Sequence, residues 1–432
     1  MKINDYFLYL IDFFKTFYYI KIKEPIKRFW SEMVVSMKNS GIRNFIFAIF
    51  AGTLIGAGAV FFYCSPGNSK YVSSDVKRDN TFQGSNLFDF FGQLNVEDEV
   101  VPQLSLGCYA YSTLDSETRV VYDEVYYTLI NHSESREVST ANMNVLEDAV
   151  RAVYADHGEI FWVSGYSYIQ ELKNNNIVSI IYEPTYTMDK DNRGAYQTRI
   201  DSRVNAIISN ADMTDDFSKV KSVYDWLAEN VEYNLSAPES QNILSAILYK
   251  ETVCQGYADA MQYLLTKMGV QCSVVSGIVD GDAHTWCLVR MDGDYYYVDP
   301  TLAASIYSKD NLARGKFTNY TFFGVTTKEI LMTHSIKEYY TLPVCTANKD
   351  NYFVHEGLYI TEWDEETIGQ MFADAYNSGQ TMYSIRFSDI NLYDQATANL
   401  ITLHRIKDYI NELESIEYIS NYRYCILTLK FR

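Results

Sequence analysis

The stretch that decides the fold reads Thr252-Val253-Cys254-Gln255-Gly256-Tyr257-Ala258-Asp259-Ala260-Met261-Gln262-Tyr263-Leu264-Leu265-Thr266-Lys267-Met268-Gly269. Its apolar side chains recur at helical spacing, and Gly269 follows as a residue suited to end a helix. Cys254 is therefore expected in the first turn of a core-packed helix, where free N–H groups and the helix dipole stabilise a thiolate. Gly256 is expected to leave room for a substrate backbone. The simpler alternative is a structural cysteine at a helix start.

Thirty residues after Cys254 begins a pattern typical of a β-hairpin. Asp292-Gly293 separates two β-rich runs and favours a two-residue turn. Such a turn pairs positions whose numbers sum to 585, which places Asp299 opposite Trp286. His284 then becomes a diagonal neighbour of Asp299 on the same face of the ladder, unless a bulge shifts the register.

A thiol, an imidazole and a carboxylate together can perform nucleophilic catalysis. The carboxylate fixes the tautomer of the imidazole and stabilises its charged form, and the imidazole takes the proton of the thiol. Taken singly, each residue has a structural alternative: His284 as a satisfied core histidine, and Asp299 as a strand-end cap before Pro300. Their joint placement makes Cys254, His284 and Asp299 the candidate catalytic residues.

Over about residues 215–305 the sequence resembles the transglutaminase-like superfamily of papain-type cysteine enzymes. The resemblance is carried by Val253-Cys254-Gln255-Gly256-Tyr257-Ala258, by Gly277 with His284-Thr285-Trp286, and by Tyr297-Val298-Asp299-Pro300-Thr301. Residues 155–162 and the segment after Pro343 resemble flanking regions of membrane-anchored members from Gram-positive bacteria. Two positions depart from the usual pattern: Cys287 stands where many members have Asn, and a Tyr295-Tyr296-Tyr297 run replaces the usual Trp.

The resemblance implies roles for the three candidates. Cys254 would be the nucleophile, His284 the general base and acid, and Asp299 the residue that orients His284. It also implies an α+β fold in which the Cys-bearing helix packs on an antiparallel sheet, flanked by α/β regions. The backbone N–H of Cys254 is the expected oxyanion donor, and a second donor cannot be placed from the sequence. The two departures do not touch the three residues but can alter the pocket.

Residues 44–64 are 21 residues without a charge, about 31 Å long as a helix, and predict one transmembrane helix. Residues 1–43 hold eight basic and four acidic residues, which favours a cytoplasmic N-terminus and an extracellular body. The long basic leader and the bulky residues before Cys64 argue against a cleaved signal. Residues 6–20 are expected either to lie on the inner leaflet as an interfacial helix or to pack on a partner protein.

The remaining chain divides by its patterns. We expect a linker at 65–95, an α/β region at 96–200, the transglutaminase-like domain at 201–345 and a C-terminal α/β region at 346–432. Helical spacing is expected at 116–133, 142–156, 195–211, 217–232, 364–378 and 393–414. Short strands are expected at 160–163, 178–182, 383–387 and 424–431.

Composition excludes several function classes. The net charge of −19 argues against nucleic-acid binding. The seven cysteines include no C-x-x-C pair, so neither a zinc site nor any other metal or cofactor is expected. Asp280, Asp282, Asp292 and Asp294 lack EF-hand spacing and are expected to be turn residues. His157 is expected at a helix end, while His334 and His355 are expected to be surface or packing residues.

The sequence therefore predicts a membrane-anchored extracellular cysteine enzyme of the amide hydrolase or acyltransferase class. Its partner would be a peptide or protein substrate, with the cell wall as a candidate setting. The alternative is a catalytically silent transglutaminase-like scaffold on the cell surface. The sequence does not choose between water and an amine as the acceptor, nor does it fix the oligomeric state.

Overall fold

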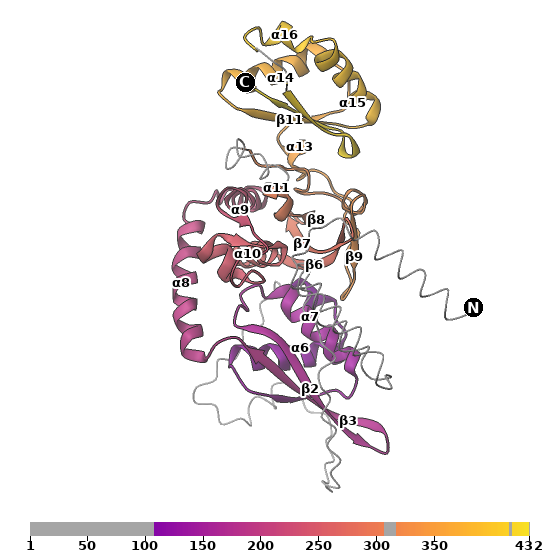
Figure 1. Ribbon diagram of the computed structural model, residues 1–432. Helices are drawn as coiled ribbons and strands as arrows, with labels where there is room; N and C mark the ends of the chain where they lie inside the picture. Colours follow the sequence, from indigo (N-terminus) through magenta and orange to yellow (C-terminus); the bar gives the residue numbers. More distant parts are fainter. Residues whose placement is uncertain (1–107, 306–316, 414–416, 432) are drawn as a thin grey trace, which may run out of the picture. The chain divides into compact units, whose positions relative to one another are not determined.

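The computed structural model describes residues 108–305, 317–413 and 417–431 (Figure 1). These residues form an α+β fold, with four small sheets among the helices of the described part. Among them, no helix combines the length and the apolar character needed to cross a bilayer. The expected tail, transmembrane helix and linker of residues 1–95 lie outside the described residues. The division into domains likewise stays a prediction.

The first described part holds three helices and a three-stranded antiparallel sheet of order β1-β3-β2. The elements are α5 (Tyr109–Thr113), α6 (Ser116–Ile130), β1 (Arg136–Val138), α7 (Met143–Asp156), β2 (Val163–Lys173) and β3 (Asn176–Tyr186). The two expected helices are present because Asp115 and Asn142 cap their first turns. The strand expected at 160–163 begins later, because residues 160–162 precede β2. Strands β2 and β3 form a longer hairpin, which turns at Asn174 and Asn175 with positive φ.

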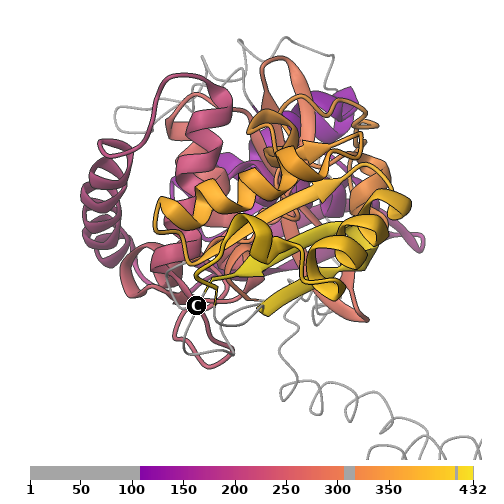
Figure 2. The ribbon, with the colours of Figure 1, turned by 90° about the horizontal axis from the view of Figure 1, so that it is seen from above.

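The central part contains the helix that begins at Cys254 and the sheet on which it packs. Its elements are α8 (Lys190–Ile208), α9 (Asp216–Asn230), β4 (Glu232–Tyr233), a π-helix (Leu244–Tyr249), β5 (Glu251–Thr252), α10 (Cys254–Lys267), β6 (Cys272–Val279), β7 (Asp282–Met291), β8 (Asp294–Val298), α11 (Thr301–Ser305), α12 (Thr327–Ile330) and β9 (His334–Lys337). Helix α8 lies at the periphery in both views, and along its length only Ile200, Val204 and Ile207 are buried (Figures 1 and 2).

The main sheet is antiparallel, with order β8-β7-β6-β9. The β7–β8 register pairs Cys287 with Val298 and Met291 with Asp294, so the predicted sum of 585 is confirmed. Asp292 and Gly293 both have positive φ, as a tight two-residue turn demands. No bulge intervenes in this pairing, and the register brings the end of β8 beside the start of β7.

Both faces of β7 are buried. Cys287 and Val289 of β7 belong to the large core that α10 and the first described part share. Trp286 and Leu288, which alternate with them, belong to a second cluster that includes Phe353 and Tyr424. Burial on both sides explains why β7 reads as a continuous apolar run and not as an alternating one.

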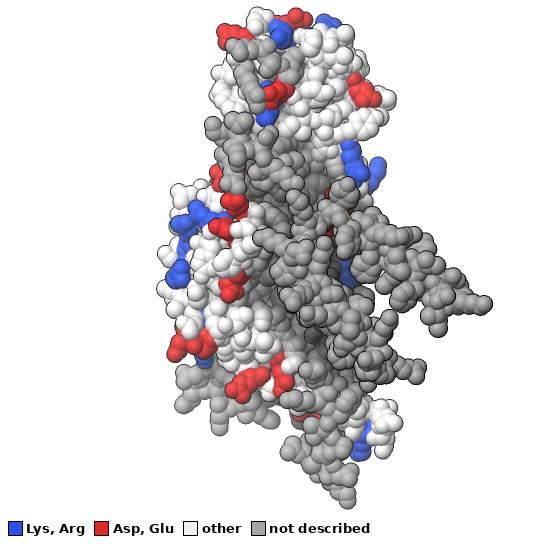
Figure 3. All heavy atoms as spheres, in the orientation of Figure 1, with Lys and Arg blue, Asp and Glu red and all other residues white. Residues whose placement is uncertain are grey.

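The C-terminal part is a sheet of order β10-β11-β13-β12 with helices packed on it. Its elements are α13 (Tyr352–His355), β10 (Tyr359–Ile360), α14 (Glu365–Asn377), β11 (Met382–Phe387), α15 (Ile390–Ala396), a π-helix (Thr397–Thr402), α16 (Ile406–Tyr409), β12 (Glu417–Asn421), a short 3-10 helix (Tyr422–Tyr424) and β13 (Ile426–Lys430). On the face drawn in Figure 3, small groups of acidic and basic side chains are interspersed over the described surface.

The expected single helix over 393–414 is wrong. The helix starts earlier, widens into the π-helix and stops before His404, which has a φ of 56°. The Thr397 hydroxyl donates to the Tyr393 carbonyl, a bond that competes with the regular helical pattern. The break redirects the chain so that Ile406 and Ile410 are buried in the C-terminal core.

Candidate active site

Cys254 is the first residue of α10, where the sequence places it. Val253 precedes the helix in an extended conformation, and no side chain caps the first turn. The Cys254 side chain is partly exposed, whereas Gly256 and Tyr257 directly after it are buried. Cys254 therefore lies at the positive end of a 14-residue helix, where it is partly accessible, while most of the helix is anchored in the core.

Gly256 serves packing and not substrate access, contrary to our expectation. A Cβ at this position would overlap the Thr252 hydroxyl and lie 2.9 Å from the Asn242 carbonyl oxygen. Thr252 in turn shares a 2.6 Å hydrogen bond with Ser245 of the π-helix. Glycine is required because the segment before the helix packs directly on its first turn.

His284 and Asp299 contact each other as the hairpin register predicts. His284 lies near the start of β7, opposite Gly277 of β6. Its Nε2 lies 2.7 Å from Asp299 Oδ2. A side chain at Gly277 would overlap the Ser335 carbonyl oxygen and approach the Trp286 ring. Strand β6 therefore packs closely against β9 and Trp286 at the position that pairs with His284.

Asp299 is completely buried and still carries its charge. Its Oδ1 accepts hydrogen bonds from the amides of Thr301 at 2.9 Å and Leu302 at 3.4 Å. Burial alone would raise the pKa of this carboxyl. The positive charge and hydrogen bond of His284 outweigh burial and hold the pKa of Asp299 well below its usual range.

The imidazole of His284 also interacts with the Cys254 thiol. Burial disfavours the charged ring, but the charges and hydrogen bonds of Asp299 and Cys254 prevail and raise the pKa of His284 to about 10. Burial likewise opposes ionisation of Cys254, yet the hydrogen bond and charge of His284 lower the pKa of the thiol. The two opposite shifts favour transfer of the proton from the thiol to His284. Asp299 occupies Nε2, which leaves Nδ1 as the ring nitrogen available to the thiol.

His334 is a fourth member of this group that the sequence did not reveal. We expected a surface or packing residue, but its side chain is fully buried and its Nε2 lies 3.2 Å from Asp299 Oδ2. His334 starts β9, and its partner in the sheet is Val279 of β6. Nothing in the spacing of residues 299 and 334 marks this contact, because it arises from the pairing of strands β6 and β9.

A line of hydrogen bonds continues from His334 into the C-terminal part. His334 Nδ1 lies 2.8 Å from the Thr333 hydroxyl, which lies 2.9 Å from the Tyr424 hydroxyl. Tyr424 also donates to the Glu329 carbonyl oxygen at 3.0 Å. Phe322 packs edge-on against both His334 and Tyr424. The carboxylate of Asp299, which orients His284, is thus supported by hydrogen bonds from residues that are far apart in the sequence.

A cleft of about 330 Å³ lies beside the start of α10, and none of Cys254, His284 and Asp299 lines it. Its lining includes Gln255 and the buried Asp259 of α10, together with Ser240 and His157. Gln255 Nε2 donates to Asp259 Oδ1 at 2.8 Å, but burial dominates and raises the pKa of Asp259 well above its usual value. This shift favours the protonated form of Asp259. The cleft can offer both donors and acceptors to an amide group.

Tyr233 of β4 is a second neighbour that the sequence did not single out as a site residue. It is partly exposed, and burial together with the negative charge of Cys254 raises the pKa of its hydroxyl to about 12. The strand that carries it pairs with β5 immediately before Cys254. The lead-in motif of the sequence therefore supplies a phenol close to the thiol.

The donor set of His284, Asp299 and His334 also has the composition of a metal site. Its geometry fits direct hydrogen bonding better. Two ligands of one zinc ion are roughly 3.3 Å apart when each lies about 2.0 Å from it in a tetrahedron. The 2.7 Å between His284 Nε2 and Asp299 Oδ2 is the distance of a charge-assisted hydrogen bond.

The other singled-out residues have structural positions. Cys287 is fully buried and directs its sulfur to the Ala258 carbonyl oxygen at 3.5 Å, under α10. Asp280 and Asp292 occupy hairpin turns with positive φ, as expected, whereas Asp282 and Asp294 are the first residues of strands β7 and β8. His157 ends α7 and pairs with Glu159 at 2.9 Å, as expected of a helix-end histidine. The six described cysteines are free thiols.

Residues 203–300 match the transglutaminase-like superfamily. This transglutaminase-like domain includes Cys254, His284 and Asp299, and the mixed helix and sheet structure around it fits the expected α+β class. The superfamily typically contains cysteine proteases and acyltransferases, and the domain supports an enzyme of this broad kind. His334 lies outside the matched range.

Three solved structures are similar to part of the chain. The crystal structure of a TGase is 16% identical, covering 32% of this chain and 44% of that one, with a TM-score of 0.22. A putative cysteine protease from Cytophaga hutchinsonii is 12% identical, covering 33% and 63%, with a TM-score of 0.22. The periplasmic domain of TgpA from Pseudomonas aeruginosa is 16% identical, covering 32% and 58%, with a TM-score of 0.20.

The matches span less than two thirds of each of these structures, and such scores support no conclusion about activity. No curated protein matches the chain. The resemblance to membrane-anchored proteins of Gram-positive bacteria stays a prediction.

Proposed function

We propose that the chain is a cysteine-dependent enzyme that transfers the acyl group of an amide in a peptide or protein substrate. One observation carries the proposal: His284 is hydrogen bonded to a buried, charged Asp299 and interacts with the thiol of Cys254. A histidine held in this way can both receive the thiol proton and return it. The transglutaminase-like domain over residues 203–300 supports the same class of chemistry.

In the proposed reaction the Cys254 thiolate attacks the carbonyl carbon of the amide. His284 gives its proton to the departing nitrogen, which leaves an acyl group on the sulfur as a thioester. His284 then takes a proton from the incoming acceptor, which is water in hydrolysis and an amine in cross-linking. The Cys254 backbone N–H is our candidate donor to the oxyanion. The cleft with Gln255 and Asp259 is our candidate site for an amide of the substrate.

The proposed location rests on the sequence. A transmembrane helix at 44–64 and a basic tail support an enzyme tethered to the membrane with its body outside the cell. Substrates would then be peptides or proteins at the cell surface.

Site-resolved labelling tests the chemistry. The full-length chain in detergent is treated briefly with iodoacetamide at neutral pH, and each cysteine is quantified by mass spectrometry. We expect Cys254 to react first, and His284→Ala to abolish that preference. His355→Ala, which removes an exposed histidine of α13, is the matched control and leaves labelling unchanged. Equal labelling of all the cysteines in the unmodified chain would contradict the proposal and favour a silent scaffold.

A comparison of cells with the native chain and with Cys254→Ala identifies the acceptor. Surface proteins are digested and scored for new termini, for deamidated side chains and for cross-linked peptides. New termini or deamidation that depend on Cys254 indicate water, and cross-links indicate an amine. An identical pattern in both cells would contradict a role of the thiol at the cell surface.

A further inference from the structure

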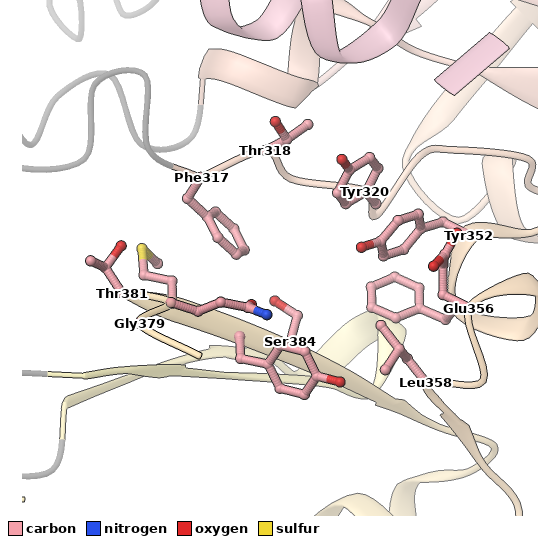
Figure 4. Close-up of a pocket in the computed structure, with 13 residues that line it drawn as sticks. Phe317, Thr318, Tyr320, Tyr352, Glu356, Leu358, Gly379, Thr381 and Ser384 are labelled. Atoms are coloured by element: carbon pink, nitrogen blue, oxygen red, sulfur yellow. The ribbon is translucent and has the colours of Figure 1, made fainter. Parts of the chain in front are cut away.

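A cleft of about 720 Å³ runs beside the N-terminal half of β11, and none of the proposed catalytic residues lines it (Figure 4). Figure 4 shows Phe317, Tyr320 and Tyr352 along one side and Thr381 and Ser384 along the other. Its volume lies within the range of cavities that hold sizeable ligands. The proposed acyl transfer makes no use of this cleft.

The hydrogen bonds of β11 show which way its main chain points. The Phe431 amide donates to the Thr381 carbonyl, and the Phe387 amide donates to the Cys425 carbonyl. Odd-numbered residues of β11 therefore direct their N–H and C=O groups to β13, because these groups alternate along a strand. Met382 and Ser384, between them, direct theirs to the opposite edge.

That opposite edge is only half covered. The Arg386 amide donates to Leu358, and the Ser388 amide donates to Ile360, which is the pairing with the two-residue strand β10. Pairing stops there, and within the described chain no backbone or side-chain group bonds the main-chain groups of Met382 and Ser384. Both residues line the cleft.

We infer that this cleft binds an extended peptide segment of a protein partner, which adds to the sheet as a strand in line with β10. Met382 and Ser384 are two residues apart, so their N–H and C=O groups match alternate residues of an extended chain. The unpaired part of the β11 edge carries no Pro or Lys. An unpaired strand edge without such residues is unusual, because it can recruit other strands. Glu356 is the one charged side chain among the described residues that line the cleft, and it favours a basic residue in the peptide.

Tyr320, one of the aromatic side chains that line the cleft, favours a peptide over a sugar. A sugar ring needs an open aromatic face on which to lie. Tyr320 has one face stacked on Tyr352 at 3.6 Å and packs on Tyr224 at 5.6 Å with an interplanar angle of 21°. Its hydroxyl is also engaged, because it donates to Asp225. Tyr320 therefore forms a rigid wall of the cleft and presents no free platform.

The test measures peptide retention by the immobilised full-length chain. All chains carry Cys254→Ala, so that no probe is turned over and the result does not depend on the proposed acyl transfer. The probe is a fluorescent heptapeptide library with Lys at the centre and random uncharged residues elsewhere. A second library of the same composition is N-methylated at every amide and cannot pair as a strand. We expect about tenfold stronger retention of the unmethylated library, the effect of roughly one or two net hydrogen bonds.

Ser384→Pro is the diagnostic variant, because proline removes an N–H that does not bond β13 and is tolerated at such edge positions. It should lower retention to the level of the N-methylated library. Ser384→Ala, which keeps the amide and removes only the hydroxyl contact with Thr428, should retain the library as before. Equal retention of the two libraries by the chain that keeps Ser384 overturns the inference. This comparison stands even if the Ser384→Pro chain fails to fold. Displacement of the library by a chitin hexasaccharide also overturns it.

Discussion

Replacement of Asp299 by Asn isolates the electrostatic support of His284. The asparagine side chain would have nearly the same shape, but its NH₂ group would face Nε2–H groups of two histidines where Asp299 Oδ2 now accepts from both. To avoid opposing donors, His284 must move its proton from Nε2 to Nδ1, the nitrogen that the Asp299 contact leaves available to Cys254. The ring could then no longer accept the proton of the thiol.

The structure sets the size of this effect. The bond lost is a charge-assisted hydrogen bond of 2.7 Å inside a fully buried site. Such bonds contribute about 1.5–3 kcal/mol, and a mid-range loss of about 2 kcal/mol corresponds to a roughly 30-fold decrease in the thiolate available at Cys254. We expect the second-order rate of Cys254 alkylation at neutral pH to fall by about that factor.

The assay is stopped-flow or quenched alkylation with iodoacetamide, resolved for each cysteine by mass spectrometry. Asp350→Asn is the matched control, because Asp350 is also buried and lies outside the site. It should leave the Cys254 rate unchanged. An Asp299→Asn chain that is folded by circular dichroism and alkylates Cys254 at the native rate would refute the reasoning.

Two further predictions concern the same group. The hydrogen bond and charge of His284 outweigh burial and lower the pKa of Cys254, while burial raises the pKa of Cys345 to about 11. Alkylation at neutral pH should therefore favour Cys254 over Cys345, and this preference should narrow as the pH rises towards 11. A Cys254 rate that follows the ionisation of an ordinary thiol, at about pH 8.5, would contradict this. His334→Leu removes a donor to Asp299 and should slow Cys254 alkylation by about three- to tenfold, whereas His334→Gln, which keeps an N–H donor, should recover part of the rate. Equal rates in the two variants would show that His334 only fills space.

Local patterns allowed much of the site to be predicted. The helix from Cys254 ends at Lys267, and Gly269 follows the capping residue with a φ of 79°, as its position after the last apolar residue indicated. The hairpin register followed from Asp292-Gly293, because a two-residue turn leaves no freedom in the pairing that follows. These features depend on neighbours within a few residues, and so the sequence alone is sufficient to place His284 beside Asp299.

Non-local packing accounts for what the sequence could not supply. His334 reaches Asp299 because β9 pairs with β6, and no signal within residues 299–334 specifies that pairing. The role of Gly256 depends on a π-helix that packs on the start of α10. The expected helix at 393–414 failed because burial of Ile406 in the C-terminal core prevails over helical spacing.

Two buried aspartates show why charge state in particular must come from structure. Asp299 and Asp259 are both almost inaccessible to water. Asp299 receives donors from two histidines and two amides, and its pKa is lowered, whereas Asp259 receives one bond from Gln255, and its pKa is raised. Burial penalises both anions alike, so the number and charge of the donors decide the outcome. The anion of Asp299 can stabilise a positive His284, and the protonated form of Asp259, which its raised pKa favours, can donate a hydrogen bond in the cleft that it lines with Gln255. The donors around each carboxyl group therefore give the same residue type opposite tendencies to ionise.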